Sequence, residues 1–202
     1  WGAGNRYLTY TLYSQTSTDI IILDFEKNRH KRLAGYSGLN AGCALSNKGV
    51  FAAMTLSKGG KQVDLFVKDI ATDKLYAMTN DSFVEASPCW SPDDRQICYV
   101  GSKDRRPTLF VVSARGGAPK RLANLLAEAV SPDWSAVSNK ICFAVLKGGQ
   151  YTIAEIDMNK DDREPRILVS AAGDWEAPSW TADGRHLVCS RKLDGEQKLY
   201  LV

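Results

Sequence analysis

The sequence has no long hydrophobic run and almost no excess of charge. None of its apolar segments approaches the ~18 residues that a membrane span requires, so we predict no direct membrane insertion. Its 26 Lys and Arg residues nearly balance 23 Asp and Glu residues. The two basic stretches, residues 29–32 and 103–106, are short and fall between strand candidates, which indicates solvated loops. We therefore predict no nucleic-acid partner.

Metal-ligating residues are also few. The five cysteines are an odd number without a CxxC pair, which argues against a zinc site and against a fully paired disulfide framework. The two histidines, His30 and His186, fall near turns and lack Cys, Asp or Glu partners at metal spacing. Cys98, Cys142 and Cys189 take matching places in apolar segments, where a thiol behaves as a small buried hydrophobe. We expect no metal and no cofactor.

Catalytic and nucleotide-binding motifs are absent as well. There is no GxSxG nucleophile elbow, because residues 35–38 fail the spacing, and there is no phosphate-binding loop. The glycine pairs at 59–60 and 148–149 are typical of hairpin tips. Asp24, Asp69 and Asp157 recur at regular intervals, which favours turn capping over acid–base chemistry. The sequence therefore predicts that the chain is not an enzyme.

What the sequence does have is an internal repeat of 44–46 residues. Short β-branched or aromatic segments alternate with turns rich in Gly, Asp, Asn or Pro, which is typical of strands. Three series of equivalent positions share the period: Trp1, Leu45, Trp90, Trp134 and Trp180 before a turn; Asp24, Asp69, Ser113 and Asp157 at the end of one strand; Leu33, Met78, Leu122 and Leu168 at the end of another. A four-stranded unit of ~40–45 residues is the size of a β-propeller blade. The sequence therefore predicts an all-β propeller of four-stranded antiparallel blades.

The period divides the chain into five units. We expect them at about residues 1–38, 39–83, 84–128, 129–174 and 175–202, with the last unit incomplete. The first unit begins at its Trp and lacks the rest of its innermost strand, so we expect the sequence to be a piece of a longer chain. The best local helical pattern, residues 122–129, is too short to matter. Large flat side chains suit the wedge between neighbouring blades, and we assign this structural role to Trp90, Trp134 and Trp180.

Three segments carry a resemblance to a known family. They are SPCWSPDDRQICYV (residues 87–100), APSWTADGRHLVCS (177–190) and LNAGCALSNKGVFAAMTLSKGGKQVDLFVKDIATDKLYAMT (39–79). They are similar to the repeats of the TolB family, the periplasmic propeller proteins of the Tol-Pal system. The resemblance covers essentially the whole chain. It implies a six-bladed propeller, a location in the periplasm, and a small α/β domain that this chain does not show.

The resemblance also implies a function. TolB-like proteins bind the peptidoglycan-associated lipoprotein through the propeller, and inner-membrane Tol proteins through the N-terminal domain. In a propeller, the segments that lead into the innermost strands line one mouth of the central channel, and small polar residues there suit a concave docking surface. We expect partner-binding residues in these segments: Leu39, Asn40, Gly42, Glu85, Ala86, Ser131, Trp175 and Glu176. Trp175 lies outside the Trp series and is equally consistent with an interface anchor and with loop packing.

Two other functions stay open from the sequence. The propeller could belong to a hydrolase that resembles the prolyl oligopeptidases, with its catalytic domain outside this sequence. It could also be a TolB-like repeat protein that binds another ligand, because propellers share an architecture without sharing ligands.

Overall fold

The computed structural model describes residues 2, 4–15, 17–58, 62–103, 106–123, 125 and 127–202. Within these residues the chain forms eighteen strands and no α-helix. The strands pair in antiparallel fashion with their neighbours in the sequence. The prediction of an all-β fold is therefore confirmed. The described residues contain no helix that is long and apolar enough to span a membrane.

The strands form five sheets that follow one another along the chain. The first sheet contains β1 (Tyr7–Tyr13), β2 (Thr18–Asp24) and β3 (Arg29–Ala34). The second contains β4 (Asn40–Leu45), β5 (Phe51–Leu56), β6 (Asp64–Asp69) and β7 (Leu75–Ala77). The third contains β8 (Glu85–Trp90), β9 (Gln96–Gly101), β10 (Thr108–Ser113) and β11 (Lys120–Arg121). The fourth contains β12 (Ala129–Trp134), β13 (Lys140–Lys147), β14 (Gln150–Asp157) and β15 (Arg166–Ile167). The fifth contains β16 (Asp174–Trp180), β17 (Leu187–Leu193) and β18 (Glu196–Leu201).

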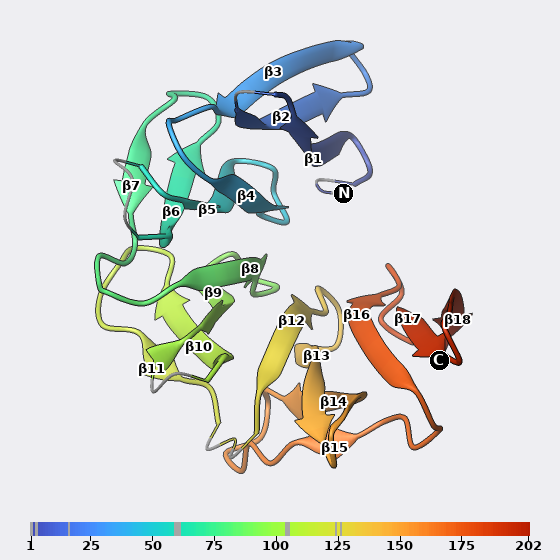
Figure 1. The fold of residues 1–202 in the computed structure, drawn as a ribbon. Helices are drawn as coiled ribbons and strands as arrows, with labels where there is room; N and C mark the ends of the chain where they lie inside the picture. The colour runs from blue at the N-terminus through green and yellow to red at the C-terminus, as the bar shows by residue number, and fades with distance from the viewer. Residues whose placement is uncertain are drawn as a thin grey trace.

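The five sheets are arranged in an arc around a common centre, as the blades of a propeller (Figure 1). The first strand of each later sheet (β4, β8, β12 and β16) lies toward the centre, and β3, β7, β11 and β15 lie at the periphery. The predicted propeller of small antiparallel sheets is confirmed. The described residues form five blades, so the count of six is not confirmed.

The core lies between the sheets rather than within a single one. Alternate side chains of a strand point to opposite faces, so Ile97 and Tyr99 pack against the second sheet while Cys98 and Val100 pack against the fourth. Equivalent clusters join the first sheet to the second and the fourth to the fifth. Each blade is therefore stabilised by the apolar faces of its neighbours.

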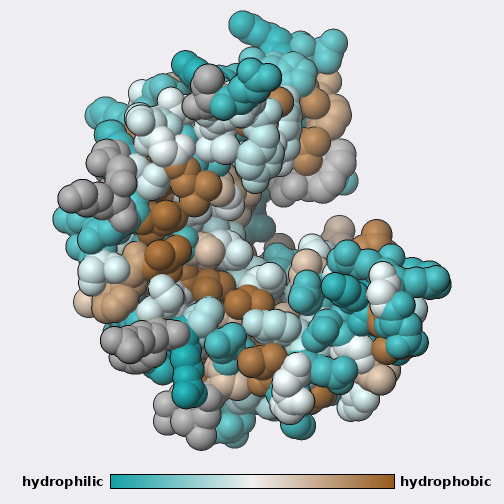
Figure 2. Space-filling model, viewed as in Figure 1, coloured by the Kyte–Doolittle hydropathy of each residue, from teal (hydrophilic) through white to brown (hydrophobic). Residues whose placement is uncertain are grey.

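Some apolar surface remains exposed. Leu199 and Leu201 of β18 are 76% and 65% exposed on the outer side of the fifth sheet, and Tyr13 is 73% exposed on the first sheet. Figure 2 shows hydrophobic residues that run from the second sheet into the third on the viewed face.

The basic stretch at 29–32 was predicted to be a solvated loop, and this is wrong because it forms most of β3. β3 is an outermost strand with solvent along its side, so it can form without alternating apolar residues. Its first four residues are exposed, and only Leu33 and Ala34 at its end are buried. Residues 122–129 form no helix where the structure describes them. Trp1 and the Gly pair 59–60 lie outside the described residues.

Other local predictions are confirmed. Cys98, Cys142 and Cys189 are buried free thiols. Gly148 and Gly149 link β13 to β14 with φ of 60° and 82°, as a two-residue hairpin requires. Asp24, Asp69 and Asp157 each accept a backbone N–H of the turn that follows them.

Candidate docking site

The residues predicted to bind a partner lie at the starts of the four innermost strands. Leu39 precedes β4, and the others lie within strands: Asn40 and Gly42 in β4, Glu85 and Ala86 in β8, Ser131 in β12, Trp175 and Glu176 in β16. β8 packs beside β4 and β12, and β12 packs beside β16. These starts form one surface, which we call the strand-start rim: residues 39–42, 84–87, 128–131 and 174–177.

A bulge recurs at the same place in each of these strands. The register shifts between Ala41 and Ala44 in β4 and at equivalent places in β8, β12 and β16. The residue at the bulge has a left-handed backbone in all four strands: Gly42 (φ 58°), Ser87 (49°), Ser131 (52°) and Ala177 (49°). Only the first is a glycine, so the other three store strain of roughly 1–2 kcal/mol each. Sequence reasoning missed the bulges.

The signal that could have found the bulges is a proline inside the strand. Pro88, Pro132 and Pro178 each follow the left-handed residue and are buried. Proline has no N–H to donate to the ladder, so a strand paired on that side must break its register there. The bulges mark where the rim ends along each of these strands.

Asn40 is a fully buried residue of the rim, and its hydrogen bonds hold the exposed residues in place. Its Nδ2 donates to the carbonyls of Tyr36 (2.7 Å) and Gly38 (3.2 Å), and its Oδ1 accepts the N–H of Tyr36 (3.1 Å). These bonds close the loop that presents Leu39. The side chain of Asn40 therefore positions the rim and has no free surface for a partner.

Glu85 is also buried, with 2% of its surface exposed. Thr79 Oγ1 donates to Glu85 Oε2 at 2.9 Å, and Asp64 and Asp81 lie close to the same carboxyl group. Burial, reinforced by these two acids, raises the pKa of Glu85 to about 7. Glu85 is thus a buried protonatable residue of the rim, below its exposed surface.

Trp175 is 4% exposed and packs as a core residue. Its ring lies 5.2 Å from that of Tyr200, and the Arg191 guanidinium lies 5.3 Å above it. Its Nε1 donates to the carbonyl of Ala171 at 3.0 Å. Of the two interpretations of Trp175, this geometry favours loop packing.

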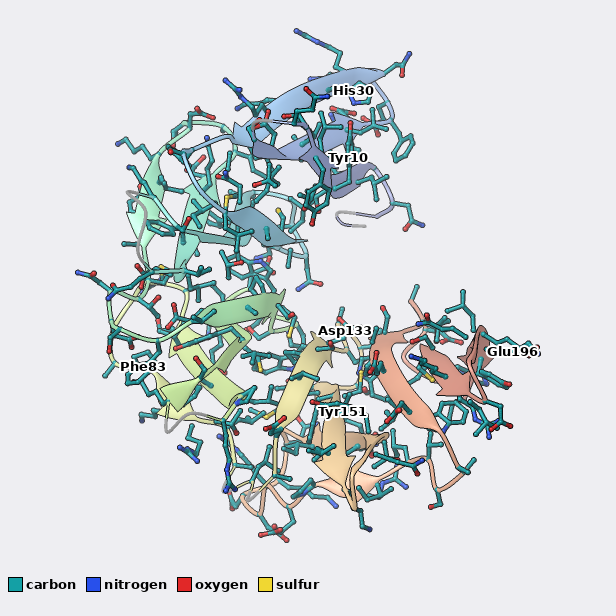
Figure 3. The ribbon with its side chains drawn as sticks, in the orientation of Figure 1. Tyr10, His30, Phe83, Asp133, Tyr151 and Glu196 are labelled. Carbon is teal, nitrogen blue, oxygen red and sulfur yellow. The ribbon has the colours of Figure 1, made fainter. Side chains whose placement is uncertain are left out.

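The exposed rim is apolar on the second and third sheets. Leu39 is 41% exposed, and Val84, which takes the equivalent place before β8, is 54% exposed. Phe83 lies next to Val84 and carries the Lys103 ammonium 5.6 Å from its ring centre (Figure 3). Ala86, just inside the rim, is partly exposed.

The exposed rim is acidic on the fourth and fifth sheets. Glu128 and Asp174 take the places equivalent to Leu39 and Val84, and Glu176 is exposed beside them. Tyr151 (Figure 3) donates its hydroxyl to Glu128 Oε2 at 3.3 Å and its N–H to Asp174 Oδ1 at 3.0 Å. Burial, followed by the charge of Glu128, raises the pKa of Tyr151. The rim therefore offers apolar contacts on one half and negative charge on the other.

The opposite end of the innermost strands carries the tryptophans. Trp90 lies between the second and third sheets, stacks on Phe51 at 6.4 Å and donates its Nε1 to the carbonyl of Ala44 at 2.9 Å. A cavity of about 690 Å³ at this end is lined by Trp90, Trp134 and Trp180, together with Asp133.

Asp133 (Figure 3) joins the fourth sheet to the fifth. Its Oδ2 accepts the N–H of Trp180 at 2.7 Å and the hydroxyl of Ser179 at 3.2 Å. Burial raises its pKa. The Asp133 side chain therefore links the fourth sheet to the fifth by hydrogen bonds.

No group of three or more His, Cys, Asp or Glu side chains in the described part of the chain is placed to hold a metal ion. Burial raises the pKa of the Cys43 thiol to about 12 and raises the pKa of Cys89, Cys142 and Cys189 as well. These thiols are protonated at neutral pH, so they are poor nucleophiles and poor metal ligands.

The match to a known family covers every residue of the chain. The family model described as "TolB beta propeller domain" matches residues 1–202. The chain belongs to the TolB β-propeller family. A curated relative, "Tol-Pal system protein TolB" of Francisella tularensis subsp. tularensis (strain WY96-3418), is 26% identical over 146 residues, which is 71% of this chain and 33% of the relative. The chain thus spans about a third of the length of this TolB protein.

Solved structures show the same fold. TolB from Acinetobacter baumannii has a TM-score of 0.86 and 21% identity over 100% of this chain and 50% of its own. A structure from a study of two prolyl endopeptidases has a TM-score of 0.69 and 14% identity over 98% of this chain and 33% of its own. At these identities both likenesses concern the fold alone, whereas the TolB family model also matches the sequence.

Proposed function

We propose that this chain is a non-enzymatic protein-binding scaffold of the Tol-Pal system in the periplasm, and that its propeller docks the peptidoglycan-associated lipoprotein at the strand-start rim. The observation that carries the proposal is the match of the TolB propeller family to the whole chain, together with the name of its curated relatives. The division into five repeat units and the six-bladed ring remain predictions within this proposal.

The rim geometry supports different roles for the predicted residues. Leu39 and Glu176 are exposed and make the direct contacts. Gly42, Ala86 and Ser131 are small, so the partner approaches the backbone closely there. Asn40, Glu85 and Trp175 are buried, and they position the residues above them. A partner that fits this rim presents an apolar group to the second and third sheets and a basic group to the fourth and fifth.

The mechanism we propose is competition. The propeller covers the surface with which the lipoprotein binds peptidoglycan, and it releases that surface when an N-terminal segment, outside this chain, engages an inner-membrane Tol protein. The hydrolase alternative is supported only by the similarity in fold to the prolyl endopeptidase structure. The sequence of this chain contains no catalytic motif.

Calorimetric titration of the complete protein with the periplasmic domain of its own peptidoglycan-associated lipoprotein tests the proposal. We expect a saturable one-to-one heat. Leu39→Asp and Glu176→Lys should each weaken binding at least ~10-fold, because central interface residues dominate affinity. Glu164→Lys makes the same charge change as Glu176→Lys at an exposed loop between β14 and β15 and should leave the affinity unchanged.

Two outcomes would count against the proposal. The absence of heat with a folded propeller would remove the lipoprotein as the partner. Binding that survives both rim substitutions would move the docking site elsewhere on the propeller.

A further inference from the structure

A groove of about 1070 Å³ lies between the outer parts of the second and third sheets. Its floor is apolar and is formed by Phe51, Val67, Met78 and Ala114. The groove is bordered by the turns after β4 and β8 and by the loop after β10. It shares no lining residue with the strand-start rim, so it is a separate feature of the surface.

The walls of this inter-sheet groove keep apolar side chains in solvent. Val50 is 44% exposed and Tyr76 is 49% exposed, although both lie beside a buried floor. On the opposite side, Gly116 has no side chain and leaves the space open. Exposed apolar side chains that gather around a groove mark interaction sites more often than isolated ones do.

The groove is lined by three acids and three cations, so its formal charge is balanced, and the preference for an acidic ligand depends on which of these side chains are free to bind. Its three acids are already engaged, because Asp69, Asp93 and Asp94 accept hydrogen bonds from the N–H groups of turns. Those bonds lower the pKa of Asp69, and the hydroxyl of Ser91, with the N–H of Arg95, lowers that of Asp93.

The three cationic side chains of the groove make fewer hydrogen bonds and ion pairs than its three acids. Neither Lys48 nor Arg115 makes an ion pair within the described part of the chain. Arg95 approaches Asp93 only at 3.7 Å, and its side chain is 85% exposed. Exposed pairs of this kind contribute little, so the guanidinium is available to a ligand.

β7 adds a backbone edge to the same groove. Val67 faces Tyr76 across the β6–β7 pair, and the flanking bonds run from Met78 N to Leu65 O and from Asp69 N to Lys74 O. The alternation of antiparallel bonding then directs the N–H and C=O of Leu75 and Ala77 away from β6. An extended peptide can pair with such an edge, which a small carboxylate cannot do.

We propose that the inter-sheet groove binds an extended acidic peptide segment of a partner protein. An apolar side chain of the peptide packs on Tyr76 and Val50, and carboxylates flank it and pair with Lys48, Arg95 and Arg115. This site would let the propeller hold a second protein while the strand-start rim is occupied.

Fluorescence anisotropy with three labelled peptides of one length tests this proposal: the acidic DEVLVED, the neutral NQVLVQN and the basic KKVLVKK. The titrant is the chain itself. We expect a Kd on the order of 10–100 μM for the acidic peptide and at least ~10-fold weaker binding for the other two. The double variant Lys48→Glu/Arg115→Glu should lose about tenfold for the acidic peptide, and Tyr76→Ala about threefold.

The matched control is Lys147→Glu/Lys192→Glu, which changes the net charge by the same amount at exposed places on the fourth and fifth sheets. It should leave the affinity for the acidic peptide unchanged. The proposal is overturned if wild type shows no saturable binding at millimolar peptide, or if the groove and control variants lose affinity equally. Circular dichroism melting of each variant checks that it is folded.

Discussion

Glu85 is expected to make the stability of this protein fall as the pH rises toward neutrality. Its carboxyl group is buried, accepts a hydrogen bond from Thr79, shares a hydrogen bond with Asp81, and lies near Asp64. Tyr99 packs nearby, and Lys103 pairs with Asp81 at 3.7 Å. Protonated Glu85 satisfies this environment, because it can donate to Asp81 and accept from Thr79. Ionised Glu85 is repelled by both acids.

The size of the effect follows from the pKa. Burial raises the pKa of Glu85 from an ordinary value of 4.5 to about 7. Between these values the folded chain keeps a proton that the unfolded chain has lost, so the free energy of unfolding decreases as the pH rises through this window. Above about pH 7 both states are ionised and the dependence ends. With 1.36 kcal/mol for each pKa unit, the difference between 4.5 and about 7 sets an upper limit of about 3 kcal/mol on this loss.

Urea unfolding of wild type and Glu85→Gln across about pH 5 to 8 measures this loss. Glutamine keeps the hydrogen bonds to Thr79 and Asp81 and cannot ionise. The two proteins should have similar stability near pH 5, and the variant should be more stable by up to about 3 kcal/mol near pH 8. Glu176→Gln, on the exposed rim, is the control and should keep the wild-type pH profile. Parallel profiles for wild type and Glu85→Gln would refute the reasoning.

Substitutions at three further residues test contacts between blades and strain within them. Lys68→Met should lower the free energy of unfolding by about 2 kcal/mol in urea, because the buried Lys68 Nζ donates to the carbonyl of Leu33 at 2.6 Å. Asp133→Ala should cost about 1–2 kcal/mol by leaving the N–H of Trp180 unpaired, and Asp133→Asn should recover part of this loss. Ala177→Gly should raise stability by up to ~1 kcal/mol, because glycine adopts the left-handed bulge backbone without strain. A decrease for Ala177→Gly would show that the methyl group packs more favourably than the strain costs.

The sequence predicted the architecture well because the signal repeats. A single strand such as Gln96–Gly101 is ambiguous by itself, but its equivalents at Lys140–Lys147 and Leu187–Leu193 confirm the assignment. The outermost strands were harder to predict. The repeat predicts a strand that ends at Leu33, but residues 29–32 were assigned to a loop, since a strand with solvent along its edge needs little apolar pattern.

The positions of the candidate residues in the fold were predictable, but the exposure of their side chains was not. The start of each innermost strand follows from the repeat, so Leu39, Glu85 and Glu176 were assigned to one surface. Whether each side chain faces solvent depends on partners far away in the sequence: Trp175 is covered by Tyr200 and Arg191. No local pattern carries that information.

The position of the core between sheets has a consequence for how the molecule opens. Each apolar cluster spans two neighbouring sheets, so every blade depends on the one or two blades beside it. The second, third and fourth sheets have a neighbour on both sides in this chain, and the first and fifth have one. Amide hydrogen exchange should therefore show that two sheets which share an apolar cluster open together, so that the blades behave as coupled neighbours rather than as one block.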